Sequence, residues 1–161
     1  MSAQLFKRYY HTNVECAGSM TCIRPFCYLE QQENYESTIN TGCILLRPLT
    51  KIYVQQVTKE RYGPYGKYRP IISYPPEEWC KVMLDSAVNP IYKLAVQAVA
   101  NSVPELFHIC PYWGPVNAYN MTLNMDKIFA LFSPGDYSNT LLVFDDSDSQ
   151  IFKIKVFTRV H

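Results

Sequence analysis

The sequence of 161 residues contains six cysteines, and their number and spacing say more about its chemistry than any other residue type. No two of them form a Cys-x-x-Cys pair, and no histidine is placed near such a pair, whereas zinc sites are usually built from closely spaced Cys and His ligands. The even count therefore favours disulfide bonds over zinc, and disulfides are typical of secreted proteins. The six positions are Cys16, Cys22, Cys27, Cys43, Cys80 and Cys110.

The other chemically reactive residue types do not form a recognisable catalytic set. The three histidines have no neighbouring nucleophile or carboxylate motif that would indicate a catalytic triad, and no Gly-x-Ser-x-Gly motif is present. Asp145, Asp146 and Asp148 suggest calcium, but they lack the Gly and the distant Glu of an EF-hand loop, so a polar hairpin turn is the preferred interpretation. We therefore expect no enzymatic activity, no metal ion and no cofactor.

Two short segments bear on the cellular location. Asn120-Met121-Thr122 is an acceptor sequence for N-glycosylation, which takes place on the secretory route. The first eight residues lack the apolar core of a signal peptide, and no run of about 18 apolar residues is present that could span a membrane. We expect an extracellular protein, glycosylated at Asn120, from which the signal peptide has been removed and to which Met1 was added for expression.

The composition is that of one folded domain covering residues 1–161. The formal net charge is +1 without long runs of one sign, which argues against a nucleic-acid or polyanion partner held by bulk electrostatics and leaves specific recognition open. With 13 Tyr and 8 Phe against 6 Gly, the chain favours strands over disorder. Residues 62–70 mix aromatic and basic side chains as a nucleic-acid stacking platform does, but a solvated hairpin tip is the preferred interpretation.

The longest helical pattern, residues 89–102, begins with Asn89 as the N-cap and Pro90 in the first helical position. Apolar residues recur through it with helical periodicity, and a narrow polar stripe is flanked by a wide apolar arc. We therefore expect a helix that is mostly covered and that packs as a lid against the edge of a sheet. Cys80 and Cys110 flank this segment, and a bond between them would stabilise the fold by roughly 3 to 4 kcal/mol.

About eight short segments favour β-strands, several of them alternating apolar and polar residues with the period of two that a half-buried strand requires. The clearest is residues 151–160, in which apolar residues alternate with Lys153 and Lys155. The first two predicted strands are joined by a Gly-Ser turn, so Cys16 and Cys27 could face each other across a hairpin. We expect a mainly β protein, built as an immunoglobulin-like two-sheet sandwich with one helix at its edge.

A series of short motifs occurs along the chain, including Asn13-Val14-Glu15-Cys16, Trp79-Cys80, Cys110-Pro111-Tyr112 and Pro134-Gly135-Asp136-Tyr137. Their order resembles a known family over nearly the whole chain. This family is a large insect family of uncharacterised secreted proteins, related to the ML (lipid-recognition) superfamily and similar to the chemosensory CheA and CheB proteins and to ganglioside activator proteins. The chain departs from the family pattern at Glu78, where most members have Asp, and at Pro75-Pro76, which interrupt the preceding strand.

The resemblance implies a disulfide pairing and a ligand site. Two cysteines are additional to the family's usual four, and we expect these two to bond to each other. The implied pairs are Cys22–Cys43, Cys16–Cys27 and Cys80–Cys110. The resemblance also implies an ML-like sandwich whose two sheets splay apart around an apolar ligand, although the same apolar residues could fill a dry core. The residues expected to contact the ligand are Ile91, Leu94, Ala98, Phe129, Phe132, Leu142, Phe144 and Ile154.

Two hypotheses for the function follow. In the first, a secreted non-enzymatic protein holds a lipid, hydrocarbon, pheromone or other small apolar ligand between its sheets, in chemosensation or lipid transport. In the second, an extracellular interaction module contacts a membrane receptor or channel through its surface, without an internal ligand. An interior cavity larger than ~300 Å³ would favour the first, and a filled sandwich with a large exposed apolar patch would favour the second.

Overall fold

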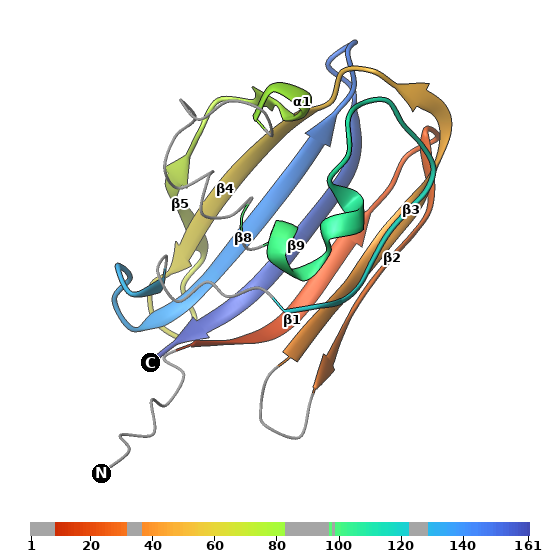
Figure 1. The fold of residues 1–161 in the computed structure, drawn as a ribbon. Helices are drawn as coiled ribbons and strands as arrows, with labels where there is room; N and C mark the ends of the chain where they lie inside the picture. Colours follow the sequence, from red (N-terminus) through yellow and green to blue (C-terminus); the bar gives the residue numbers. More distant parts are fainter. Residues whose placement is uncertain (1–8, 32–36, 83–96, 98, 123–128) are drawn as a thin grey trace.

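Two antiparallel sheets lie face to face, as predicted (Figure 1). The structure is a computed structural model and describes residues 9–31, 37–82, 97, 99–122 and 129–161. The large sheet has the strand order β1-β9-β8-β4-β5, with β6 paired to β4, and the small sheet has the order β2-β3-β7. The strands are β1 (Tyr9–Ala17), β2 (Cys22–Gln31), β3 (Ser37–Leu49), β4 (Tyr53–Arg61), β5 (Tyr68–Ser73), β6 (Glu77–Glu78), β7 (Tyr112–Met121), β8 (Gly135–Phe144) and β9 (Gln150–Val160).

Apolar and polar side chains alternate along β9, and this alternation sets which face of the strand is buried. Phe152, Ile154 and Val156 face the small sheet, so Lys153 and Lys155 project from the opposite surface. This arrangement confirms the orientation predicted from the alternation. The predicted hairpin tip is also found, but it is shorter than the predicted 62–70: exposed residues 62–67 connect β4 to β5, and residues 68–70 already pair with β4 as part of β5.

Three disulfides join the strands, and no described cysteine is free. They are Cys16–Cys27, Cys22–Cys43 and Cys80–Cys110, the pairs that the resemblance implies. The expected hairpin between the strands of Cys16 and Cys27 was wrong, because β1 pairs with β9 and β2 pairs with β3. The Cys16–Cys27 bond therefore crosslinks the two sheets, which is a stronger constraint on their separation than a bond within one hairpin.

The helix predicted at 89–102 falls mostly outside the described residues. Within them, Gln97 and residues 99–102 are helical, and Val99 is partly buried against the core between the sheets. The structure adds two short helical segments, α1 (Trp79–Val82) and the 3₁₀-helix η1 (Pro104–Leu106). No helix within the described part of the chain has the length and hydropathy needed to cross a membrane.

Buried apolar residues form three clusters. Two of these lie between the sheets and include Leu45, Leu49 and Ile39 of β3. The third cluster joins the aromatic rings of Tyr9, Phe129, Phe132 and Tyr137 with Val160. The first two clusters also surround an unfilled space, which is the candidate functional site.

Candidate ligand cavity between the sheets

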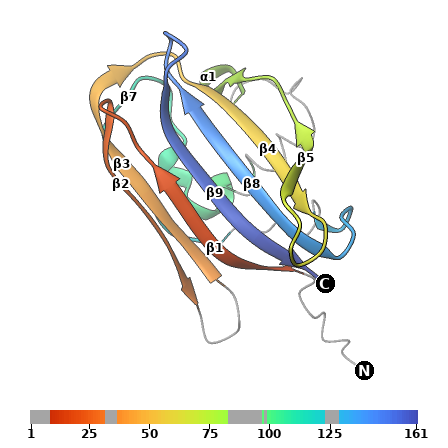
Figure 2. The ribbon, with the colours of Figure 1, turned by 180° about the vertical axis from the view of Figure 1, so that it is seen from behind.

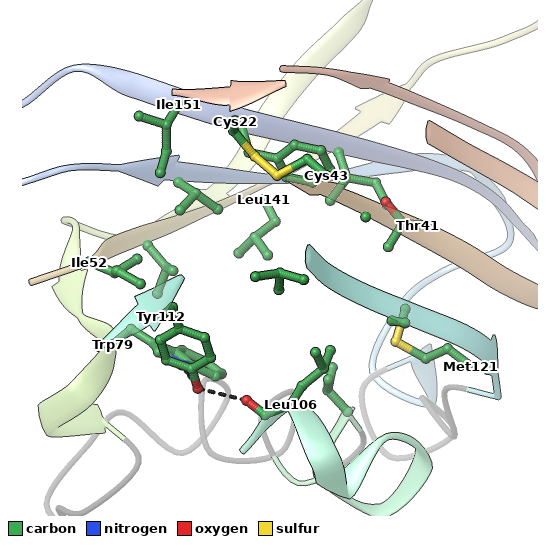
Figure 3. Close-up of a pocket in the computed structure, with 18 of the residues that line it drawn as sticks. Cys22, Thr41, Cys43, Ile52, Trp79, Leu106, Tyr112, Met121, Leu141 and Ile151 are labelled. Carbon is green, nitrogen blue, oxygen red and sulfur yellow. Dashed lines mark hydrogen bonds between the residues drawn. A yellow bond between two sulfur atoms is a disulfide. The ribbon is translucent and has the colours of Figure 1, made fainter. Parts of the chain in front are cut away.

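An apolar cavity of about 350 Å³ lies between the two sheets (Figure 3). Figure 3 shows Leu141 of the large sheet and Cys43 of the small sheet among the lining residues, with Trp79 and Tyr112 together at one end. Side chains from both sheets and from the segment between β6 and β7 form its wall. They include Ile39, Cys43, Leu45, Val54, Gln56, Trp79, Leu106, Tyr112, Val116, Ala118, Met121, Leu141, Val143, Phe152, Ile154 and Val156.

The large-sheet wall is set by strand register. In the pairing of β4 with β8, Gln56 lies opposite Leu141, and in the pairing of β8 with β9, Leu141 lies opposite Ile154. Residues that are paired across antiparallel strands project from the same face. One row of side chains on three strands therefore points into the cavity, although these strands are far apart in the sequence.

The small-sheet wall is formed by β3 and β7. Ile39, Cys43 and Leu45 occupy alternate positions on β3 and all three are buried. Cys43 pairs in register with Val116 of β7, whose side chain also lines the cavity. The Cys22–Cys43 disulfide is part of the same wall, so one crosslink stabilises the small sheet where the cavity weakens its packing against the large sheet.

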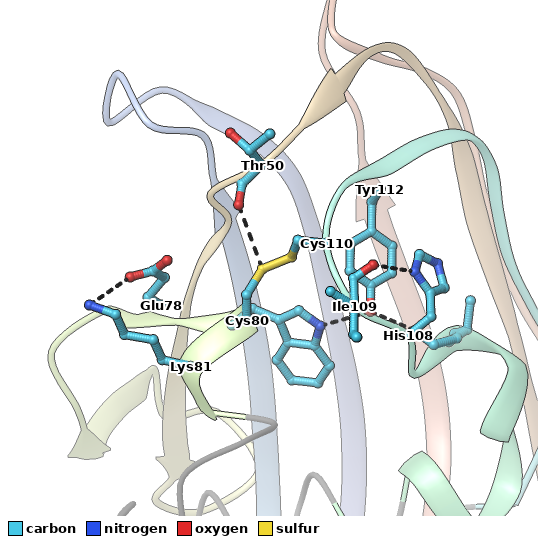
Figure 4. Close-up of a disulfide and its surroundings, with 10 residues drawn as sticks. Thr50, Glu78, Cys80, Lys81, His108, Ile109, Cys110 and Tyr112 are labelled. Atoms are coloured by element: carbon cyan, nitrogen blue, oxygen red, sulfur yellow. Dashed lines mark hydrogen bonds and ion pairs between the residues drawn. A yellow bond between two sulfur atoms is a disulfide. The ribbon is translucent and has the colours of Figure 1, made fainter.

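Hydrogen bonds hold one end of the cavity in place. Trp79 Nε1 donates to the Tyr112 hydroxyl at 3.2 Å, and that hydroxyl donates to the Leu106 carbonyl oxygen at 2.6 Å. The Cys80–Cys110 disulfide lies beside this group, and Figure 4 shows it next to Tyr112. Three segments that are separated in the sequence are thus fixed against one another at this end.

His108 belongs to the same end of the molecule and is engaged structurally. Its Nδ1 lies 2.9 Å from the Ile109 carbonyl oxygen, and its ring centroid is 4.2 Å from that of Tyr112. Figure 4 shows His108 and Ile109 beside the disulfide, with no described nucleophile hydrogen-bonded to the imidazole. His108 therefore packs against Tyr112 and the backbone at this end of the cavity.

Two of the polar side chains that border the cavity are hydrogen-bonded to other groups of the protein. Thr41 Oγ1 donates to the Phe26 carbonyl oxygen at 3.0 Å, and Asn139 Oδ1 accepts from Thr58 Oγ1 at 2.7 Å. No Lys, Arg, His, Asp or Glu occurs among the described lining residues. Burying a charge without a partner costs several kcal/mol, so the cavity is suited to an uncharged, apolar group.

The structure brings few of the predicted ligand residues to the cavity. Ile154 lines it, whereas Leu142 and Phe144 do not, because their neighbours Leu141 and Val143 point inward instead. A shift of one residue along a strand moves a side chain to the opposite face. The run from Leu141 to Phe144 is apolar throughout, so its sequence contains no alternation from which the inward face could be recognised.

Phe129 and Phe132 lie in the third apolar cluster, which does not line the cavity. Phe132 stacks on Tyr137 with ring centroids 4.9 Å apart. Burial, together with the nearby Glu60 carboxylate, raises the pKa of Tyr137 to about 12, and its hydroxyl donates to the Ser133 carbonyl oxygen. These two predicted residues therefore have a packing role. The other three, Ile91, Leu94 and Ala98, lie outside the described residues.

Sequence reasoning missed the residues at the end of the cavity. Trp79 and Leu106 belong to short helical segments and Tyr112 is the first residue of β7, so no apolar periodicity marks them. The available signal was their proximity in sequence to Cys80 and Cys110, since a disulfide between these cysteines must bring the adjacent aromatic residues together.

The other motifs have local structural explanations. Asp145 Oδ1 accepts hydrogen bonds from the backbone N–H groups of Ser147 and Ser149, and Oδ2 pairs with Arg47 at 2.8 Å. No group of three or more potential metal ligands was found in the described ranges. Asn120 is exposed at the end of β7, and its glycosylation stays a prediction.

Comparisons with known proteins yield matches among solved structures. No protein-family model and no curated protein matches the sequence. Among solved structures, the chain is similar to that of chicken MD-1 complexed with lipid IVa, with a TM-score of 0.38 and 10% sequence identity, over 95% of this chain and 97% of the other. None of these findings supports membership of the insect family that the motifs resemble.

Proposed function

We propose that this protein is a secreted, non-enzymatic binding protein that holds a small apolar ligand between its two sheets. The observation that carries the proposal is the cavity of about 350 Å³ with its apolar lining. Its volume exceeds the ~300 Å³ at the lower end of small-molecule sites. A lipid, hydrocarbon or pheromone fits this chemistry, in lipid transport or chemosensation.

The cost of leaving such a cavity empty supports an occupant. Engineered closed apolar voids destabilise proteins by about 24 cal/mol per Å³, because the side chains that line them lose packing contacts. A ligand in this partly open cavity would restore such contacts to the apolar lining, which favours retention of a ligand.

The size of the ligand follows from similar reasoning. Each buried methylene contributes about 0.8 kcal/mol, so roughly ten buried carbons correspond to micromolar affinity before association costs. Because no charged group occurs among the described lining residues, the buried part of the ligand should be uncharged. Affinity should therefore rise with the length of an alkyl chain until the cavity is full.

A matched pair of variants tests the proposal. Leu141→Trp places an indole in the cavity, whereas Leu142→Trp makes the same chemical change on the adjacent, outward-facing residue. Displacement of a neutral fluorescent probe by alkanols and alkanes of increasing length should show weaker binding for Leu141→Trp only. Equal affinity in both variants, or no binding at any chain length, would refute the internal site.

A second function, that of a surface interaction module, is favoured by an aromatic patch on the small sheet. Tyr28 and Tyr119 are 48% and 53% exposed, and the rings of Phe26 and Tyr119 stack with centroids 5.7 Å apart. Exposed aromatic groups of this kind are enriched at protein interfaces. If the cavity binds nothing, loss of receptor or channel binding on substitution of Tyr28 and Tyr119 by Ser would support this alternative.

A further inference from the structure

The outer face of the large sheet gathers basic side chains from strands that are distant in sequence. Inward residues of β9 line the cavity, so the residues between them project outward. Figure 2 shows the sheet from this outer side. Five of the chain's 15 Lys and Arg residues occupy outward positions on β4 and β9, with two acidic residues on the neighbouring strands β1 and β8. The basic face consists of Lys59, Arg61, Lys153, Lys155 and Arg159, and the acidic residues are Glu15 and Asp136.

The strand register arranges these cations in two lines. On β9, the line from Lys153 to Arg159 is ~20 Å long at the usual rise per residue, and β4 lies two strands away, at ~10 Å. Between them, Ser138 and Thr140 of β8 are short and buried. Longer side chains flank these short ones, so an extended ligand would lie between two lines of positive charge.

The cations differ in how far they are neutralised. Asp136 bridges Arg61 at 2.6 Å and Arg159 at 2.8 Å, which holds both guanidinium groups in place and leaves one net positive charge there. For Lys153 and Lys155, no ion pair with a carboxylate is found within the described residues. The face therefore retains a positive charge that is larger than the net +1 of the whole chain.

A hollow beside the basic face adds aromatic and amide groups. Its volume is about 500 Å³, and Asn13, Tyr68 and Phe157 line it together with Arg61, Arg159 and the Asp136 carboxylate that bridges them. The Arg61 guanidinium lies over the Tyr68 ring at 5.6 Å, and this ring meets Phe157 edge to face. Aromatic and amide side chains next to cations can contact both the rings and the anionic groups of a charged sugar chain.

We propose that this basic face binds a linear sulfated polysaccharide. Polyanions are attracted by clustered Lys and Arg at the range of a Debye length. The inference rests on the extracellular part of the proposed function, because the three disulfides indicate an oxidising environment in which sulfated sugar chains are the polyanions encountered. It does not depend on the internal cavity.

Two double variants with the same change in net charge test the proposal. Lys153→Gln with Lys155→Gln removes two charges from the basic face, and Lys51→Gln with Lys81→Gln removes two exposed charges elsewhere. The probe is a size-defined heparin oligosaccharide, titrated into the full chain by calorimetry. At about fivefold per lysine, the first variant should bind roughly 10-fold to 30-fold more weakly, whereas the second should stay within about threefold of the parent.

Further measurements make each outcome decisive. The affinity of the parent should fall steeply between low salt and about 0.15 M salt, and the slope should be smaller for the first variant. Matching thermal midpoints would establish that all chains are folded. The proposal is overturned if the parent does not bind heparin at low salt, or if both double variants lose affinity equally. Tighter binding to anionic lipid vesicles or to DNA than to heparin would also reject it, in favour of another class of partner.

Discussion

Removing the Cys80–Cys110 disulfide should weaken both stability and ligand binding, whereas removing Cys16–Cys27 should weaken stability alone. Both bonds connect the large-sheet side of the molecule with the small-sheet side. The first bond holds the end of the cavity, because Trp79 precedes Cys80 and Tyr112 closely follows Cys110. Cys16 and Cys27 pair with the cavity residues Ile154 and Thr41, but the backbone ladders of β1–β9 and β2–β3 hold those residues when the disulfide is removed. Each perturbation removes one disulfide, and the two differ only in which segments lose their crosslink.

The magnitudes follow from the lengths of the closed loops. The bonded cysteines are separated by 30 residues in Cys80–Cys110 and by 11 residues in Cys16–Cys27. Loop-closure entropy then predicts losses of about 3.6 and about 2.8 kcal/mol in the free energy of unfolding. The two losses differ by less than ~1 kcal/mol. Stability alone therefore cannot account for a large difference in ligand affinity between the variants.

The assay compares the Cys80→Ala/Cys110→Ala and Cys16→Ala/Cys27→Ala double variants. Guanidinium unfolding gives the free energies, and probe displacement under native conditions gives the ligand dissociation constants. We expect the first variant to bind about tenfold more weakly, equivalent to ~1.4 kcal/mol, as one wall loses its fixed position. Similar affinities in the two variants would refute the argument that this disulfide positions the cavity, and an unchanged unfolding free energy would refute the entropy estimate.

Two further predictions concern single side chains. The hydrogen bond from Arg159 holds the pKa of Asp136 below its ordinary value of 3.8. The pKa of Asp136 is lower in the folded than in the unfolded chain, so its ionised form stabilises the fold above pH 3.8. Asp136→Asn should therefore lower the free energy of unfolding by about 1 kcal/mol at neutral pH. In thermal unfolding, this difference should disappear as the pH falls below 3.8. Tyr112→Phe should lower the unfolding free energy by about 1–3 kcal/mol in guanidinium, because Trp79 loses an acceptor and Leu106 loses a donor. A loss below ~0.5 kcal/mol would contradict this role.

The sequence by itself determined features that depend on neighbouring residues. The alternation around Lys153 and Lys155 was sufficient to predict that β9 is a half-buried strand, since side chains in a strand alternate between its two faces. The Gly and Pro content of residues 62–70 was sufficient to predict the hairpin tip between β4 and β5. The absence of metal-ligand spacing favoured disulfides, and the described cysteines are all paired.

The tertiary structure decided which distant residues meet. Only strand pairing shows that Leu141, and not Leu142, faces the cavity, because a uniformly apolar run leaves the register of its faces open. Only sheet packing turns Cys16–Cys27 into a crosslink between sheets. The net charge of +1 does not predict the basic face, because it is a sum over the whole chain. The cations come together only when β4 and β9 join one sheet.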